Sequence, residues 1–159
     1  SGGLPVLISP WIDGEKAVMA STAALKKPTA VSLETHAQEW NEIFKGIQGA
    51  VDIVAFQDGH VAYEQLRSYL EVNKKLADQY GLVSWTNTES FDRDMPIKFL
   101  PIKFDKLQYK LAQAAAVGME KAITFEFSHF MSPQSAYKQA GHLYQRYTDY
   151  YLNSNTQNP

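Results

Sequence analysis

The stretch that decides the fold is Val51-Asp52-Ile53-Val54-Ala55-Phe56 (residues 51–56). Its side chains are almost all apolar and largely β-branched, and they do not alternate with polar ones. Such a run is typical of a strand buried on both faces, as in a parallel sheet. Gln57-Asp58-Gly59 follows immediately and predicts a turn where this strand ends.

Strands and helices alternate on both sides of this segment. Three further strands are predicted at residues 4–8, 82–85 and 122–127. One helix is predicted to be capped by Ser32 and ended by Gly46 and Gly49, and the others to cover residues 63–80, 105–117 and 135–150. Helical propensity is also present at residues 17–25, and a long loop is expected at residues 90–101.

This alternation indicates βαβ units with parallel strands and right-handed crossovers, so the predicted fold class is α/β. The four units average about 40 residues each, and eight of them would form a (β/α) barrel of about 320 residues. The chain has 159 residues, whereas a complete barrel rarely has fewer than about 200. Length and pattern together therefore predict four βα units of a barrel, a half-barrel.

Composition excludes several classes of protein. Lys and Arg total 15 against 17 Asp and Glu, and this net charge of −2 gives no basic surface for nucleic acid. No apolar run approaches the roughly 18 residues that span a bilayer, and no signal peptide is visible. The absence of cysteine excludes disulfides and thiolate metal sites without defining the compartment.

The predicted strand ends carry the candidate ligand contacts, because ligands of parallel α/β proteins bind at the carboxyl ends of strands. Each end combines aromatic rings with hydrogen-bonding side chains; the segments are residues 9–11, 56–59, 85–91 and 124–130. Sugars present apolar C–H faces and hydroxyl groups, which suit such a lining. Trp11 and Trp85 are candidate platforms, whereas Trp40 is expected in a helix core.

Two carboxylates, Glu89 and Glu126, lie on successive predicted strands. A pair about 5–5.5 Å apart supports retaining glycoside hydrolysis, and a wider pair supports inversion. Each also has a structural interpretation, Glu89 as a salt-bridged residue and Glu126 as a mid-strand partner of a backbone group or an Arg. Asp58 precedes Gly59, so its structural interpretation is an Asx turn.

The search for other chemistry gives one residue, His129, which suits a hydrogen bond to a hydroxyl group. The other three histidines are scattered, and no spacing typical of metal ligands appears. Glycine-rich phosphate-binding motifs, GxSxG and HExxH are absent. The sequence therefore predicts no metal site and no cofactor.

Four segments taken together resemble the second half of a bacterial glycosidase-like barrel family, domain of unknown function 4434. They are ISPW (8–11), DIVAFQDG (52–59), WTNTESF (85–91) and ITFEFSHFMSP (123–133). The most specific element is Gln57-Asp58-Gly59. The resemblance implies a domain over residues 4–151. Residues 1–3 are interpreted as a cloning scar or a frayed end, and residues 152–159 as a frayed tail.

This family is similar to the clan A glycoside hydrolases, which are (β/α)8 barrels. The resemblance implies that the four strands are strands five to eight, with Glu89 in the nucleophile position at the end of strand seven. The acid/base residue of those enzymes lies on strand four, which this chain lacks, and Glu126 does not match it. The implied cleft is lined by Gln57, Asp58, Asn87, Glu126 and His129, with Trp11, Trp85 and Phe125 as platforms.

Three functions remain open from the sequence. They are a retaining glycosidase-like domain that is incomplete in this chain, a barrel that binds carbohydrate without cleaving it, and a small flavodoxin-like binding module. An open four-stranded sheet leaves two unpaired edges. The expected protein partner is therefore either the missing amino-terminal half or a second copy of this chain, and the strand-end residues and the resemblance give carbohydrate as the expected ligand. The resemblance favours a periplasmic or extracellular location, which the residues themselves leave open.

Overall fold

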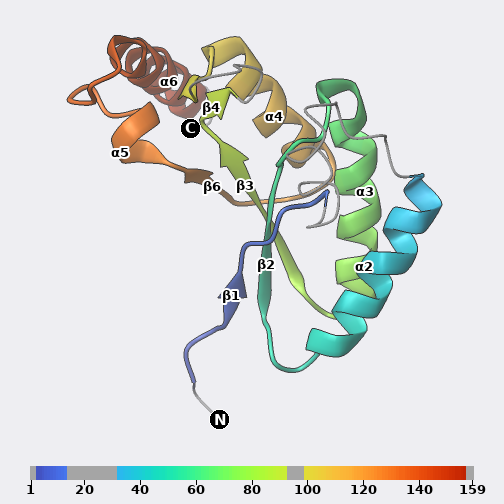
Figure 1. Cartoon of the computed structure of the whole chain (residues 1–159). Coiled ribbons are helices and arrows are strands. Elements are labelled where there is room, and N and C mark those ends of the chain that lie inside the picture. The colour runs from blue at the N-terminus through green and yellow to red at the C-terminus, as the bar shows by residue number, and fades with distance from the viewer. Residues whose placement is uncertain (1–2, 14–31, 93–98, 157–159) are drawn as a thin grey trace. The chain divides into compact units, whose positions relative to one another are not determined.

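A computed structural model describes residues 3–13, 32–92 and 99–156 (Figure 1). The chain divides into two compact units, which are described separately. Unit 1 comprises residues 1–88 and 110–123, and unit 2 comprises residues 89–109 and 124–159. The helical propensity of residues 17–25 falls outside the described residues.

The main sheet is parallel, as predicted. β1 (Leu7–Ile8) pairs with β2 (Ile53–Gln57), and β2 pairs with β3 (Val83–Glu89), both in parallel. With β6 (Ala122–Phe125) these strands form a four-stranded sheet in the order β1-β2-β3-β6. This order follows the chain, whereas flavodoxin-like folds have the order 2-1-3-4-5. The α/β class is confirmed.

Two helices of unit 1 lie on the same side of β1 and β2 (Figure 1). α2 (Leu33–Ile47) begins after Ser32, whose Oγ accepts a hydrogen bond from the backbone N–H of Thr35 at 3.2 Å, and the predicted N-cap is confirmed. α3 (Tyr63–Gln79) is followed by Gly81, whose φ of 69° is the left-handed conformation that favours glycine after a helix.

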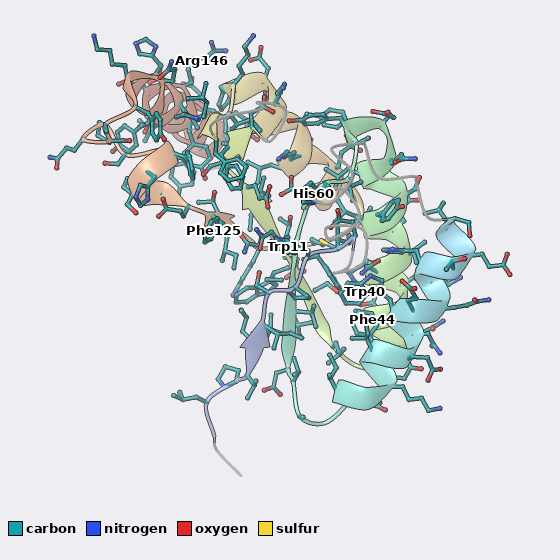
Figure 2. The ribbon with its side chains drawn as sticks, in the orientation of Figure 1. Trp11, Trp40, Phe44, His60, Phe125 and Arg146 are labelled. Carbon is teal, nitrogen blue, oxygen red and sulfur yellow. The ribbon has the colours of Figure 1, made fainter. Side chains whose placement is uncertain are left out.

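The core of unit 1 lies between these helices and β2. Trp40 and Phe44 of α2 are buried and meet the ring of Phe56 at centroid distances of 5.4 and 6.1 Å (Figure 2). The indole Nε1 of Trp40 donates to the carbonyl of Ile12 at 3.0 Å, which fixes the segment after β1 against α2. Burial of each such large side chain contributes about 1.5–3 kcal/mol, so the expectation that Trp40 belongs to the core is confirmed.

Unit 2 contains a small antiparallel pair where a loop was expected. β4 (Phe91–Asp92) pairs with β5 (Leu100–Pro101), and the backbone N–H of Ile102 donates to the Ser90 carbonyl at 2.9 Å beside them. Strands of two residues are too short to show a hydrophobic period. The loop prediction for residues 90–101 was therefore wrong at its two ends, and residues 93–98 lie outside the described part.

Helices complete unit 2. α4 (Phe104–Ala116) starts in this unit and continues into unit 1, and α5 (Phe127–Phe130) and α6 (Lys138–Thr156) follow β6. Arg146 of α6 (Figure 2) bonds to Asp105 at 3.2 Å and lies 5.2 Å from the Phe104 ring centroid, so α6 packs on the start of α4. None of the helices in the described residues is long and apolar enough to cross a membrane.

Two predicted boundaries near the carboxyl end were wrong. The last strand ends at Phe125, not at residue 127, and the expected loop after it begins with the short helix α5. Helix α6 continues to Thr156, beyond the predicted end at residue 150, so most of the tail expected to be frayed is helical.

Candidate functional site

One face of the main sheet is polar and aromatic. Val54 and Phe56 enter the helix-packed core, so the alternate residues Ala55 and Gln57 of β2 leave the opposite face. The parallel register places Trp85 beside Ala55 and Asn87 beside Gln57, on that same face. Trp11 forms a bridge with Gln57. The structure therefore brings together four of the residues predicted from the sequence: Trp11, Gln57, Trp85 and Asn87.

Hydrogen bonds fix this face, which we call the acceptor face after its free amide oxygen. The Nδ2 amide of Asn87 donates to Ser9 Oγ at 2.7 Å, and Ser9 Oγ donates to the Ala55 carbonyl at 2.9 Å. The Oδ1 atom of Asn87 is buried, and no donor among the described residues forms a hydrogen bond with it. A buried acceptor of this kind is costly unless something donates to it.

The two tryptophans of the acceptor face differ in availability. Trp11 is 36% exposed, and its ring meets His60 edge-on at 6.4 Å (Figure 2). Trp85 is half-buried, and the Lys121 ammonium lies 5.1 Å from its ring centroid. Because this cation–π contact already occupies the Trp85 ring, Trp11 provides the more available aromatic surface of this face.

Asp58 is engaged in a buried ion pair with Lys110 of α4. Lys110 is only 8% exposed, and its ammonium lies 5.7 Å from the Tyr63 ring. Lys110 was not predicted from the sequence, although Leu107, Lys110 and Ala114 follow a helical core spacing in which a lysine is unusual. The pairing gives Asp58 a structural task at the end of β2.

In the Gln57-Asp58-Gly59 motif, position 59 requires glycine because the Asp13 side chain packs closely against it. Its φ is +56°, and a Cβ atom there would overlap the carboxylate of Asp13. Asp13 Oδ2 accepts the backbone N–H of His60 at 2.9 Å, and the His60 Nδ1 atom lies 3.5 Å from the same oxygen. Asp13 was not singled out in the sequence, because nothing in its local spacing links it to a turn 46 residues later.

Unit 2 holds the remaining predicted residues. Glu89 is the last residue of β3, and its side chain is 1% exposed. Phe125 ends β6 and is 49% exposed (Figure 2), with its ring 6.3 Å from that of Phe91. The backbone N–H of Ser90 donates to the Phe125 carbonyl at 2.9 Å, and this bond joins the ends of β3 and β6.

Glu126 and His129 form a pair in unit 2. Glu126 caps α5 and is not the mid-strand residue that was predicted. Its carboxylate bonds to the Nδ1 atom of His129, to the His129 backbone N–H at 2.9 Å and to Ser128 Oγ at 2.5 Å. The Ser128 hydroxyl lowers the pKa of Glu126 most. Burial opposes this effect, and the backbone N–H and imidazole of His129 each lower the pKa by a smaller amount, so the pKa lies below its usual value. The carboxylate is therefore ionised at neutral pH.

The part of the chain that the structure describes contains no group of three His, Asp or Glu side chains arranged to hold a metal ion. Its candidate chemistry rests on carboxylates, amides, the exposed imidazole of His129 and aromatic rings. The fold and these residues define a parallel α/β protein with a polar and aromatic sheet face.

Comparison with known proteins identifies the family. The model of a domain of unknown function (DUF4434) matches residues 1–137. The chain belongs to this family, so the family named from its four motifs is confirmed. A search of curated proteins gives no significant match.

A solved structure is also similar: the crystal structure of a "putative alpha-L-fucosidase from Bacteroides thetaiotaomicron VPI-5482". It is 63% identical, with a TM-score of 0.84, and the match covers 94% of this chain and 44% of that chain. This chain therefore spans less than half the length of that relative.

Proposed function

We propose that this chain is the carboxyl-terminal half of a glycoside hydrolase-like (β/α) barrel and that Glu89 is its nucleophile. The observation that carries the proposal is the sheet face opposite α2 and α3. An internal sheet face is usually apolar, but this one presents Trp11, Gln57, Trp85 and Asn87. Glu89 follows Asn87 by two residues on β3, so its side chain leaves the same face of that strand.

The half-barrel is supported by topology. The strand order follows the chain, and α2 and α3 lie on one side of their strands, as in a barrel. Apolar side chains are exposed at both edge strands, Leu7 on β1 and Ile123 on β6. Unpaired edges and exposed apolar groups favour a partner. A relative more than twice as long supports an amino-terminal half as that partner.

The proposed chemistry is retaining hydrolysis. The Glu89 carboxylate attacks the anomeric carbon as the glycosidic bond breaks, and a water molecule then hydrolyses the resulting glycosyl ester. The acid/base carboxylate that protonates the leaving oxygen is supplied by the amino-terminal half. The name of the Bacteroides relative makes α-L-fucosides the first substrates to test.

Binding is assigned to the acceptor face. Trp11 offers its exposed ring to the C–H face of a sugar, and Asn87 Oδ1 accepts a hydrogen bond from a hydroxyl group. Gln57 lies beside Asn87 in the register and contributes a second amide. Asp58 supports this face through Lys110.

Carbohydrate binding without cleavage is the second candidate, and the burial of Glu89 favours it. A carboxylate that is 1% exposed has little surface to offer a substrate in this chain. Both candidates predict glycan binding, but only the first predicts turnover.

The test uses the completed protein, defined as this chain combined with an amino-terminal half, for which the 63%-identical relative is the source. Hydrolysis of an aryl α-L-fucoside is expected and should be lost in Glu89→Gln. The control is Glu120→Gln, at an exposed site, which should leave hydrolysis unchanged. Turnover that survives Glu89→Gln would contradict the assignment, and binding without turnover would establish the second candidate.

A further inference from the structure

We propose that Glu126 is a positioning residue for His129. It fixes the imidazole with its proton on Nδ1, so that the unprotonated Nε2 atom is presented as a hydrogen-bond acceptor for a ligand hydroxyl group. The choice of a sugar as that ligand rests on the proposed function, whereas the positioning itself does not.

The carboxylate of Glu126 is occupied within its own segment. Oε2 accepts the Ser128 hydroxyl at 2.5 Å, and Oε1 accepts the His129 backbone N–H at 2.9 Å as well as bonding to Nδ1. Both oxygens therefore have donors before any ligand arrives. This makes Glu126 a support for His129, where the sequence suggested a direct ligand contact.

The proton position follows from the chemistry of the pair. An ionised carboxylate can only accept hydrogen bonds, so the His129 Nδ1 atom must be the donor. In neutral imidazole one nitrogen donates and the other accepts, which leaves Nε2 with its lone pair. Carboxylates that bond to one nitrogen of a metal-binding histidine fix the tautomer in the same way.

The His129 ring is held but accessible. Its side chain is 73% exposed, against 25% for Glu126. Ser135 Oγ donates to the His129 carbonyl at 2.5 Å, and the backbone N–H of Ser132 donates to the Phe127 carbonyl at 2.7 Å. The backbone on both sides of His129 is thus fixed, which reduces the conformational entropy lost on binding.

Apolar surface flanks the pair. Phe125 and Phe127 adjoin Glu126 in the chain, and they are 49% and 50% exposed. Half-exposed rings next to a directed acceptor are the two features that bind a sugar, one for its C–H groups and one for a hydroxyl. We therefore assign this segment, residues 125–129, as a carbohydrate subsite of unit 2.

The decisive measurement is the tautomer of His129, read from two-bond ¹⁵N–¹H correlations of the ¹⁵N-histidine-labelled chain. At pH 7.5 the Nδ1–H tautomer is expected to predominate. In Glu126→Ala the ring should revert to the Nε2–H form that free imidazole side chains favour. The matched control is Ser128→Ala, which removes a donor to Oε2 only and should leave the tautomer unchanged.

Two results would overturn the positioning role: a predominant Nε2–H form in the unsubstituted chain, or an unchanged tautomer in Glu126→Ala. The first needs no variant, so it decides the question even if Glu126→Ala disturbs α5. In a completed protein that binds glycan, loss of this hydrogen bond in His129→Ala should weaken binding about tenfold, and unchanged affinity would overturn the subsite. A protein that binds no glycan while keeping the Nδ1–H tautomer would refute the proposed function but not the positioning.

Discussion

The Lys110 ammonium of α4 forms a buried ion pair with the Asp58 carboxylate in the turn after β2. Removing one partner of such a pair leaves an uncompensated charge in a medium that solvates it poorly. The pair therefore holds the end of β2, and with it Gln57 of the acceptor face, in a fixed place.

We predict that Lys110→Met lowers the free energy of unfolding by about 3–5 kcal/mol, as measured by urea denaturation. The control on the same helix is Lys106→Met. Lys106 is 35% exposed and pairs with Asp92 at 2.5 Å, so its loss should cost under about 1 kcal/mol. Equal effects of the two substitutions would mean that the Asp58 pair has no special role.

Gly59 gives a second prediction. The positive φ at position 59 alone should lower the free energy of unfolding of Gly59→Ala by about 1–2 kcal/mol. The overlap of the new Cβ atom with the Asp13 carboxylate should add to this loss. Gly118→Ala is the control, since Gly118 has a φ of +84° but its nearest neighbour, Lys74 Cε, lies 3.9 Å away. Thermal unfolding should therefore show a larger loss for Gly59→Ala. A loss no larger than that of Gly118→Ala would refute the overlap.

Buried His36 makes stability depend on pH. Its Nε2 atom lies 2.5 Å from Asn73 Oδ1, and burial lowers its pKa from 6.5, with Asn73, Glu39 and Asp13 opposing that effect. The unfolded chain then binds the proton more readily than the folded one. Stability should be complete above pH 6.5 and fall as the pH drops toward the lower folded pKa.

The measurement is the urea midpoint as a function of pH. The loss below pH 6.5 should be smaller in His36→Gln, which does not titrate. His142→Gln, at an exposed position, should retain the full loss. An identical pH profile for His36→Gln would show that another group is responsible.

The sheet edges give a prediction for association. The exposed apolar groups Leu7 and Ile123 on β1 and β6 should make this chain alone self-associate or bind a hydrophobic dye. Adding the amino-terminal half should give a one-to-one complex on a sizing column with light scattering. A monodisperse monomer that binds no dye and ignores the added half would contradict the half-barrel.

Much of the fold was predictable because the signals are local. The apolar run at residues 51–56 predicted β2, and the Ser32 cap and Gly81 marked helix ends through backbone hydrogen bonding and a positive φ. The two-residue strands β4 and β5 were not predictable, since their pairing depends on contacts between residues far apart in the chain.

The sequence predicted which residues belong to the candidate site, but not how they are arranged or which side chains they contact. Register now places Gln57 beside Asn87, but the partners Lys110 and Asp13 required the folded structure. Glu126 shows the limit most clearly: the aromatic residues on either side favoured a strand, whereas the hydrogen bonds of its carboxylate make it a helix cap. A short sequence pattern cannot show which side chain a carboxylate will bind.

Covalent trapping tests most directly whether Glu89 is the nucleophile. The completed protein is incubated with a 2-deoxy-2-fluoro glycosyl fluoride of the sugar it cleaves, and its peptides are mapped by mass spectrometry. We expect one glycosyl adduct on the peptide that contains Glu89, and none in Glu89→Gln. An adduct on a different carboxylate, or hydrolysis of this reagent without any adduct, would contradict this role of Glu89.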